Sequence, residues 1–203
     1  TGAGGSVWLT SGMQTGSGIV RADGGTPTSG GRTTYGGGGG RLALVVTNTG
    51  ANFSCFVGNL SAYGAHSGTI YLEKPGDIPG KGELIVNNSG GSAGYTRANT
   101  DLNGVEAVTY EFSRITLTNS GVLCIGSNDT LIITNTIMLA DGSSNGIWID
   151  GGTLLGPSVF AYSNYFIGIS ATGSTFNPAT NSLVIGTNAE LCVDVPCVLN
   201  NVV

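Results

Sequence analysis

A run of five glycines, Gly36 to Gly40, limits most strongly what this chain can fold into. Glycine has no side chain to bury and the greatest backbone freedom, yet this run leads directly into the apolar segment Arg41 to Val46. A strand-rich scaffold has a use for such a run, because glycine allows tight corners and close approach between neighbouring backbones. Glycine accounts for 36 of the 203 residues, so we expect the same requirement along much of the chain.

Short segments rich in β-branched and aromatic residues dominate the rest of the sequence, and each is bounded by Gly, Asn, Ser or Asp. No long segment has the i, i+3, i+4, i+7 apolar spacing of a helix. We therefore predict an all-β fold that forms one domain, residues 1–203, with a glycine-rich part (1–90) and a more regular strand-turn part (91–203). The expected strands are 7–9, 19–21, 41–47, 69–72, 83–86, 105–117, 122–125, 130–134, 137–139, 146–149, 165–169, 182–185 and 190–193.

Two all-β architectures fit this pattern, a parallel β-helix (solenoid) and a β-sandwich. An apolar-x-apolar motif recurs with small polar turns between its copies, and two-residue Asn-Gly hairpin loops are nearly absent, which favours the β-helix. Cys55, Cys124 and Cys192 are 69 and 68 residues apart, or three rungs of about 23 residues each. This spacing would place all three on one face, too far apart to form disulfides with one another.

Charge and hydropathy exclude several classes of function. The net charge is −5, only 9% of residues are charged, and all seven basic residues precede position 115 without forming a cluster, so nucleic-acid binding is not expected. No apolar run approaches the roughly 20 residues that span a bilayer. Low charge, abundant Asn, Gly, Ser and Thr, and an even number of cysteines predict a secreted protein, present here as a fragment or module.

The cysteines suggest one local disulfide. Cys192 and Cys197 are separated by four residues that include Pro196, and in an oxidising compartment their bond would staple the end of the chain. The alternative is that these cysteines are buried free thiols that act as small apolar side chains. The pairing of Cys55 and Cys124 is left open, and zinc binding would need a second close pair.

The first ninety residues also resemble a known repeat. The segments Gly4 to Thr10, Thr15 to Gly25 and Gly36 to Leu44, followed by Ser67 to Leu72 and Gly82 to Asn88, resemble a glycine-rich repeat of very large secreted bacterial surface proteins of the adhesin type. The resemblance implies a right-handed β-helical scaffold module at the cell surface.

Few residues point to chemistry, and we predict neither catalytic nor cofactor-binding residues. The only histidine, His66, has no nucleophile motif beside it, so we expect it in a surface loop. The spacing of Asn99, Asp101 and Asn103 matches the first half of a calcium-binding loop, but Tyr110 occupies the position of the closing carboxylate. Both a calcium site and a metal-free polar turn therefore remain open.

The sequence thus predicts a non-enzymatic, extracellular structural or adhesive module that associates end to end with itself or with neighbouring modules, in a filament or surface array. The alternative is a β-helical protein that binds or degrades polysaccharides. Aromatic side chains such as Trp148 and Tyr95 would then stack on sugar rings, or paired acids such as Glu73 and Asp77 would act on them.

Overall fold

The protein is an all-β molecule in the computed structural model, which contains no helix among the residues that it describes. Those residues are 2–25, 36–88, 98–101, 106–139, 145–157, 160–162, 165–177, 183–186, 189–196 and 198–199. The described strands are β1 (Ser6–Ser11), β2 (Ile19–Arg21), β3 (Arg41–Val46), β4 (Asn59–Ser61), β5 (Thr69–Glu73), β6 (Glu83–Asn87), β7 (Ala98–Asp101), β8 (Thr109–Thr118), β9 (Gly121–Ile125), β10 (Thr130–Leu139), β11 (Asn145–Ile149), β12 (Thr153–Leu155), β13 (Phe160–Tyr162), β14 (Tyr165–Ile169), β15 (Thr175–Asn177), β16 (Leu183–Ile185), β17 (Glu190–Val193) and β18 (Val198–Leu199).

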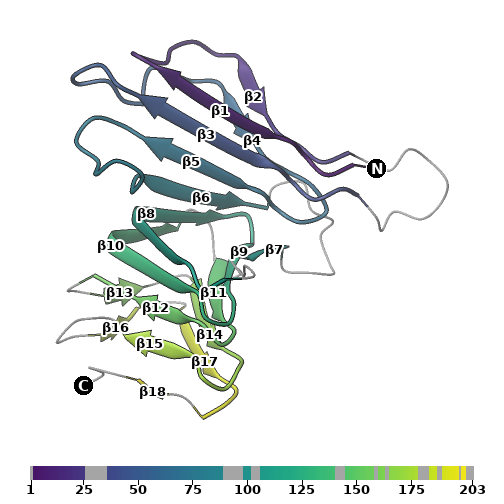
Figure 1. The fold of residues 1–203 in the computed structure, drawn as a ribbon, viewed down its shortest axis with the longest axis vertical. Helices are drawn as coiled ribbons and strands as arrows, with labels where there is room; N and C mark the ends of the chain where they lie inside the picture. Colours follow the sequence, from purple (N-terminus) through teal and green to yellow (C-terminus); the bar gives the residue numbers. More distant parts are fainter. Residues whose placement is uncertain are drawn as a thin grey trace.

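One nine-stranded sheet runs along the length of the molecule in the order β1-β3-β5-β6-β8-β10-β12-β15-β18 (Figure 1). A five-stranded sheet, β17-β14-β11-β9-β7, accompanies its second half. Two pairs, β2-β4 and β13-β16, form smaller sheets. All described strand pairings are parallel except that between β5 and β6. Because parallel neighbours cannot be joined by a tight hairpin, the chain leaves each sheet between neighbouring strands and returns.

The second half repeats with a short and regular period. In the nine-stranded sheet Thr109, Thr130, Thr153 and Thr175 are aligned on neighbouring strands. In the five-stranded sheet Cys124, Trp148, Gly168 and Cys192 are aligned in the same way. One turn of the chain therefore takes roughly 20–25 residues, a period found in repeat folds, and adds one strand to each of the two larger sheets.

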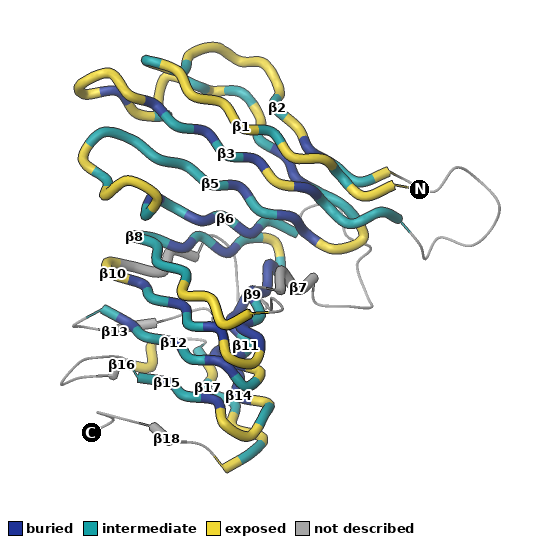
Figure 2. The backbone as a smooth tube through the Cα atoms, in the orientation of Figure 1, coloured by how far each residue is buried: buried dark blue, intermediate teal, exposed yellow. Residues whose placement is uncertain are grey.

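Residue alternation along the strands places one face of each sheet in a core, as the period of two requires (Figure 2). One core contains residues of the second half: Leu84, Val86, Ile115, Leu117, Leu123, Ile125, Leu131, Ile133, Ile147, Ile149, Leu154, Ile167, Ile169 and Phe176. The other, smaller core belongs to the first half and contains Ala22, Leu42, Leu44, Ala62 and Ile70.

The two cores lie on opposite faces of the nine-stranded sheet, and the change occurs at the antiparallel pair β5-β6. Residues directly opposite one another in an antiparallel pair share a face. Ile70, in the first core, is opposite Ile85, whereas Leu84, in the second core, is opposite Tyr71. The strand direction and the core face therefore both reverse at this hairpin.

The glycine run packs backbone against backbone, as the sequence predicts. Gly39 N donates to His66 O at 2.8 Å and Gly40 N donates to Ala22 O at 2.7 Å, so the run is bonded to segments on different sides. A Cβ at Gly39 would lie less than 3.0 Å from Ala62 O and from Gly68 N. Only a residue without a side chain allows this approach.

Candidate functional site

Several exposed apolar side chains of the first half lie on the strands at the β1 end of the molecule. β1 pairs with β3 along its full length, and no described strand pairs with its other edge. On β1, Trp8 is 71% exposed and Leu9 is 42% exposed, although Leu44, which is aligned with Leu9 on β3, is completely buried. Ile19 on β2 is 58% exposed at the same end. This β1 edge leaves the end of the first core open to solvent.

Within β1 itself, the structure shows no charged side chain, proline or bulge that would block edge pairing. Lysine, proline, bulges or covering loops usually prevent an edge strand from pairing with another chain. The edge therefore offers free backbone groups together with apolar side chains.

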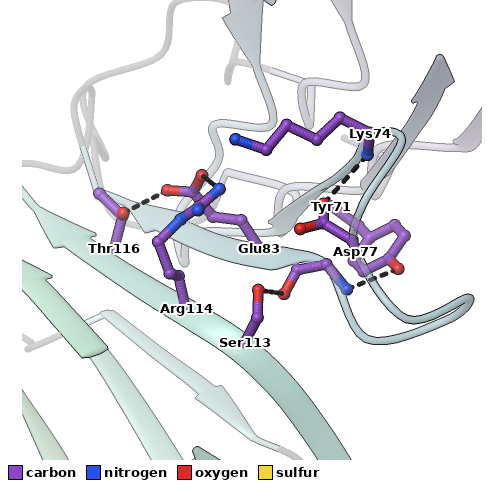
Figure 3. A network of polar contacts seen from close by, with 8 residues as sticks. Tyr71, Lys74, Asp77, Glu83, Ser113, Arg114 and Thr116 are labelled. Atoms are coloured by element: carbon purple, nitrogen blue, oxygen red, sulfur yellow. Dashed lines mark hydrogen bonds and ion pairs between the residues drawn. The ribbon is translucent and has the colours of Figure 1, made fainter. Parts of the chain in front are cut away.

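A network of polar side chains holds the β5-β6 hairpin and the neighbouring β8 (Figure 3). Glu83 on β6 accepts from Arg114 Nη2 at 3.1 Å and from Thr116 Oγ1 at 2.5 Å. Lys81 forms a second ion pair with Glu111, with Nζ 2.6 Å from Oε2. These contacts join the hairpin to β8 on the outer face of the second half, so their role is structural.

The acids that the sequence offered as a catalytic pair are engaged in the hairpin turn. Glu73 Oε2 accepts from Tyr71 Oη at 2.5 Å and from Gly80 N at 2.8 Å, and Asp77 Oδ2 accepts from Lys74 N at 3.0 Å. Burial and, to a smaller extent, the hydrogen bond to Glu73 raise the pKa of Tyr71 well above its usual value. Tyr71 is therefore a neutral donor that fixes the hairpin.

Further polar side chains form hydrogen bonds between the turns that follow the strands of the five-stranded sheet. Ser174 Oγ accepts from Gly151 N at 2.9 Å and donates to Ile149 O at 3.0 Å. Asp129 is 1% exposed, and its Oδ1 accepts from Val108 N at 3.2 Å, whereas its Oδ2 has no hydrogen-bond partner. The sequence predicted small polar turns between the strands but not the contacts between turns, which depend on which turns lie next to each other.

The corner between β8 and β9 is built from asparagines that the sequence analysis did not single out. Asn119 has a left-handed backbone (φ 51°), and its Nδ2 donates to Asn87 Oδ1 at 2.9 Å. Asn145 is completely buried, and its Oδ1 accepts from Gly121 N at 3.0 Å. Asparagine tolerates the left-handed region and can satisfy buried backbone groups, so these residues shape the corner.

The predicted calcium residues are only partly described. Asn99 and Asp101 lie on β7, with Asp101 aligned with Cys124 of β9, and Asn103 lies outside the described residues. Among the described residues, no group of three or more His, Cys, Asp or Glu side chains is placed to hold a metal ion. The calcium site stays a prediction.

The cysteines form no disulfide among the described residues. Cys124 and Cys192 lie in one column of the five-stranded sheet, three strands apart, as the spacing between them predicted. The extension of that column to Cys55 is wrong, because Cys55 lies in an exposed turn before β4 and belongs to none of the strands. Cys197 lies outside the described residues, so its bond to Cys192 remains a prediction.

The aromatic residues proposed for sugar stacking differ in their surroundings. The ring of Trp148 covers Gly168 on the next strand and packs against Phe166, with 5.3 Å between ring centroids. Trp8, in contrast, presents its ring to solvent, and its Nε1 donates to Thr10 Oγ1 at 3.1 Å. Tyr95 lies outside the described residues.

Comparison with known proteins yields no relative: no protein-family model, no curated protein and no solved structure matches the chain. The described part of the chain also contains no helix that is long and apolar enough to cross a membrane.

Proposed function

We propose that this chain is a module of an extracellular structural or adhesive scaffold, built as a right-handed parallel β-helix that associates end to end. The observation that carries this proposal is the column of aligned residues that recurs once in every turn of the chain through the second half. Repeats of this kind contact only their neighbours and leave a strand edge at each end, which needs a cap or a partner.

The hairpin β5-β6 interrupts the coil, but the two halves can still wind in the same sense. Reversing the strand direction alone would reverse the sense in which the chain winds, and moving the core to the opposite face of the sheet reverses it again. Because both changes occur at β5-β6, the two halves wind in the same sense. The right-handed twist of strands favours a right-handed return between parallel neighbours.

The use of charged groups also supports a scaffold. The ion pairs Lys81–Glu111 and Arg114–Glu83 hold strands together, and Glu73 fixes a turn. The low charge and the resemblance of residues 1–90 to a bacterial surface repeat support a location outside the cell.

Sedimentation velocity and light scattering over a wide range of concentrations test the assembly. A scaffold that associates end to end gives species larger than a monomer as the concentration rises. A chain that stays monomeric up to high concentration contradicts this part of the proposal.

The alternative function, binding to carbohydrate, is favoured by one observation, the exposed ring of Trp8. Tryptophan presents a large apolar face at low entropic cost, which suits stacking on a sugar ring. A glycan array probed with the unaltered chain and with Trp8→Ala and Trp148→Ala distinguishes the two functions. Binding that either substitution abolishes would favour the carbohydrate-binding protein over the scaffold.

A further inference from the structure

We infer that Asn52 is an acceptor site for an N-linked sugar on the folded chain. The sequence contains four Asn-x-Ser/Thr motifs, the acceptor pattern for this modification, and they begin at Asn52, Asn59, Asn87 and Asn128. Of the three motifs that the structure describes in full, that of Asn52 is presented as one exposed unit. The inference rests on the extracellular location proposed above and adds a site and a class of substrate to it.

The turn between β3 and β4 holds this motif with its two reacting residues outward. Asn52 and Ser54 are exposed, whereas Phe53 between them is half-buried and packs against the core of the first half. The chain bends just before the motif at Gly50, which has a left-handed backbone (φ 78°). Because the ring of Phe53 anchors the turn from inside, the side chains on either side of it face solvent.

Two hydrogen bonds orient the side-chain amide of Asn52. Its Oδ1 accepts from Ser54 N at 2.9 Å and from Ser54 Oγ at 2.5 Å, an arrangement of the Asx-turn type. Its Nδ2 has only a contact of 3.5 Å with Gly50 O, at the limit of a hydrogen bond. The amide oxygen is therefore engaged within the turn, while the nitrogen that would receive the sugar stays available on an exposed residue.

The modification is a group transfer to this nitrogen from a sugar that is activated as a diphosphate ester. The bond between Asn52 Nδ2 and the anomeric carbon forms, the bond from that carbon to the diphosphate oxygen breaks, and the nitrogen releases one proton. The acceptor pattern requires a hydroxyl two residues after the asparagine and excludes proline between them. Ser54 supplies the hydroxyl next to the amide, and Phe53 is the residue between.

The motif of Asn59 has the same composition but a different environment. Asn59 is exposed, but it is the first residue of β4, and its motif is paired with β2 from Ile19 to Arg21. Ser61 is 2% exposed, and its Oγ donates to Asp23 Oδ1 at 2.6 Å. An enzyme that reads this hydroxyl would have to separate β4 from β2, so we expect this motif to stay unmodified in the folded chain.

The remaining motifs are also less accessible or not fully described. Asn128 is exposed, but Asp129, the middle residue of its motif, is 1% exposed, and Thr130 belongs to β10. The motif of Asn87 ends at Ser89, which lies outside the described residues. Asn59 and Asn128 therefore serve as internal controls for Asn52.

A sugar at Asn52 is compatible with the strand pairing of the scaffold. Both edges of β3 are already paired, with β1 on one side and β5 on the other. The turn that follows β3 therefore carries the sugar away from the sheet without covering a strand edge. N-linked sugars are bulky and increase solubility, so this position suits a module displayed outside the cell.

Glycosylation of the purified, folded chain tests the inference directly. The chain is incubated with a soluble N-glycosyltransferase and a nucleoside diphosphate hexose, and peptide mapping by mass spectrometry reads each motif. Asn52 should gain one hexose at least about tenfold faster than Asn59 or Asn128, because those motifs must first open locally. Synthetic peptides that contain each motif supply the rates without the fold, to which the rates in the folded chain are normalised.

Three variants separate the motif from a general effect on the turn. Ser54→Ala should abolish modification of Asn52, whereas Ser54→Thr, which keeps the hydroxyl, should retain it. Asn59→Gln should leave the modification of Asn52 unchanged. Because Asn59 and Ser54 are both exposed, circular dichroism should show all three variants folded.

The outcomes distinguish this inference from the proposed function. A folded chain that stays unmodified at Asn52, or that is modified at Asn59 equally fast after normalisation, overturns the inference and leaves end-to-end association intact. A chain that is modified at Asn52 but remains monomeric at every concentration supports the inference and contradicts the association.

Discussion

Replacing single glycines of the Gly36 to Gly40 run by alanine tests the backbone packing that the fold requires. At Gly38 an added Cβ meets nothing within 4 Å and the backbone φ is not positive, so the substitution is compatible with the fold. Gly38→Ala should therefore raise the free energy of unfolding by about 0.4–1 kcal/mol, because alanine restricts the unfolded chain. Gly38 is thus a matched control for its neighbour.

At Gly39 the same Cβ would lie within 3.0 Å of the backbone of both Ala62 and Gly68, and backbone cannot turn aside as a side chain can. Overpacking costs about 1–3 kcal/mol, and a shift that loses one of the local hydrogen bonds adds about 0.5–1.5 kcal/mol. Because alanine also restricts the unfolded chain, part of this cost is offset. Gly39→Ala should therefore lower the free energy of unfolding by about 1–4 kcal/mol in total.

Urea denaturation followed by circular dichroism measures both variants. For a urea dependence of about 2 kcal/mol per M, the midpoint of Gly39→Ala should fall by about 0.5–2 M while that of Gly38→Ala rises slightly. If both midpoints move equally and in the same direction, the close backbone approach is not what the glycine run provides.

Three further outcomes follow from particular side chains. Tyr71 has a raised pKa, so the folded state retains its proton at a pH at which the unfolded state loses it. The free energy of unfolding should therefore fall as the pH rises above about 10. Tyr71→Phe should make this fall shallower in urea titrations between about pH 8 and 11. Leu131→Ala should cost about 2–5 kcal/mol because Leu131 is completely buried, whereas Ile132→Ala, on the opposite face of β10, should cost clearly less in the same assay. Gly168→Ala should displace the ring of Trp148 and change the near-ultraviolet circular dichroism, and an unchanged spectrum would contradict the packing described.

The sequence was informative about local structure. The strands β2, β14 and β17 occupy the predicted residues, because β-branched and aromatic residues between turn residues identify an extended segment without further context. The glycine run was predicted to be a place of close backbone approach. Glycine is the one residue type without a side chain to keep a neighbouring backbone away.

Long-range features were not predictable in this way. The antiparallel β5-β6 pair was missed, since its turn, Lys74 to Gly82, is too long to show a short hairpin signal. The short strands β12 and β15 were missed because three residues carry little periodicity, and they are strands only through their aligned neighbours. The exposure of Trp8 could not be inferred, because it depends on β1 being the last strand of its sheet.

The central claim is that each turn of the chain adds one parallel strand in register, and backbone NMR tests it most directly. In spectra of the isotope-labelled chain, nuclear Overhauser contacts between backbone protons should connect Thr109 with Thr130, Thr130 with Thr153, and Thr153 with Thr175, because aligned parallel strands lie about 4.8 Å apart. A ladder of contacts between threonines one turn of the chain apart is the predicted result. Contacts that instead pair β9 with β10 as an antiparallel hairpin would contradict the account.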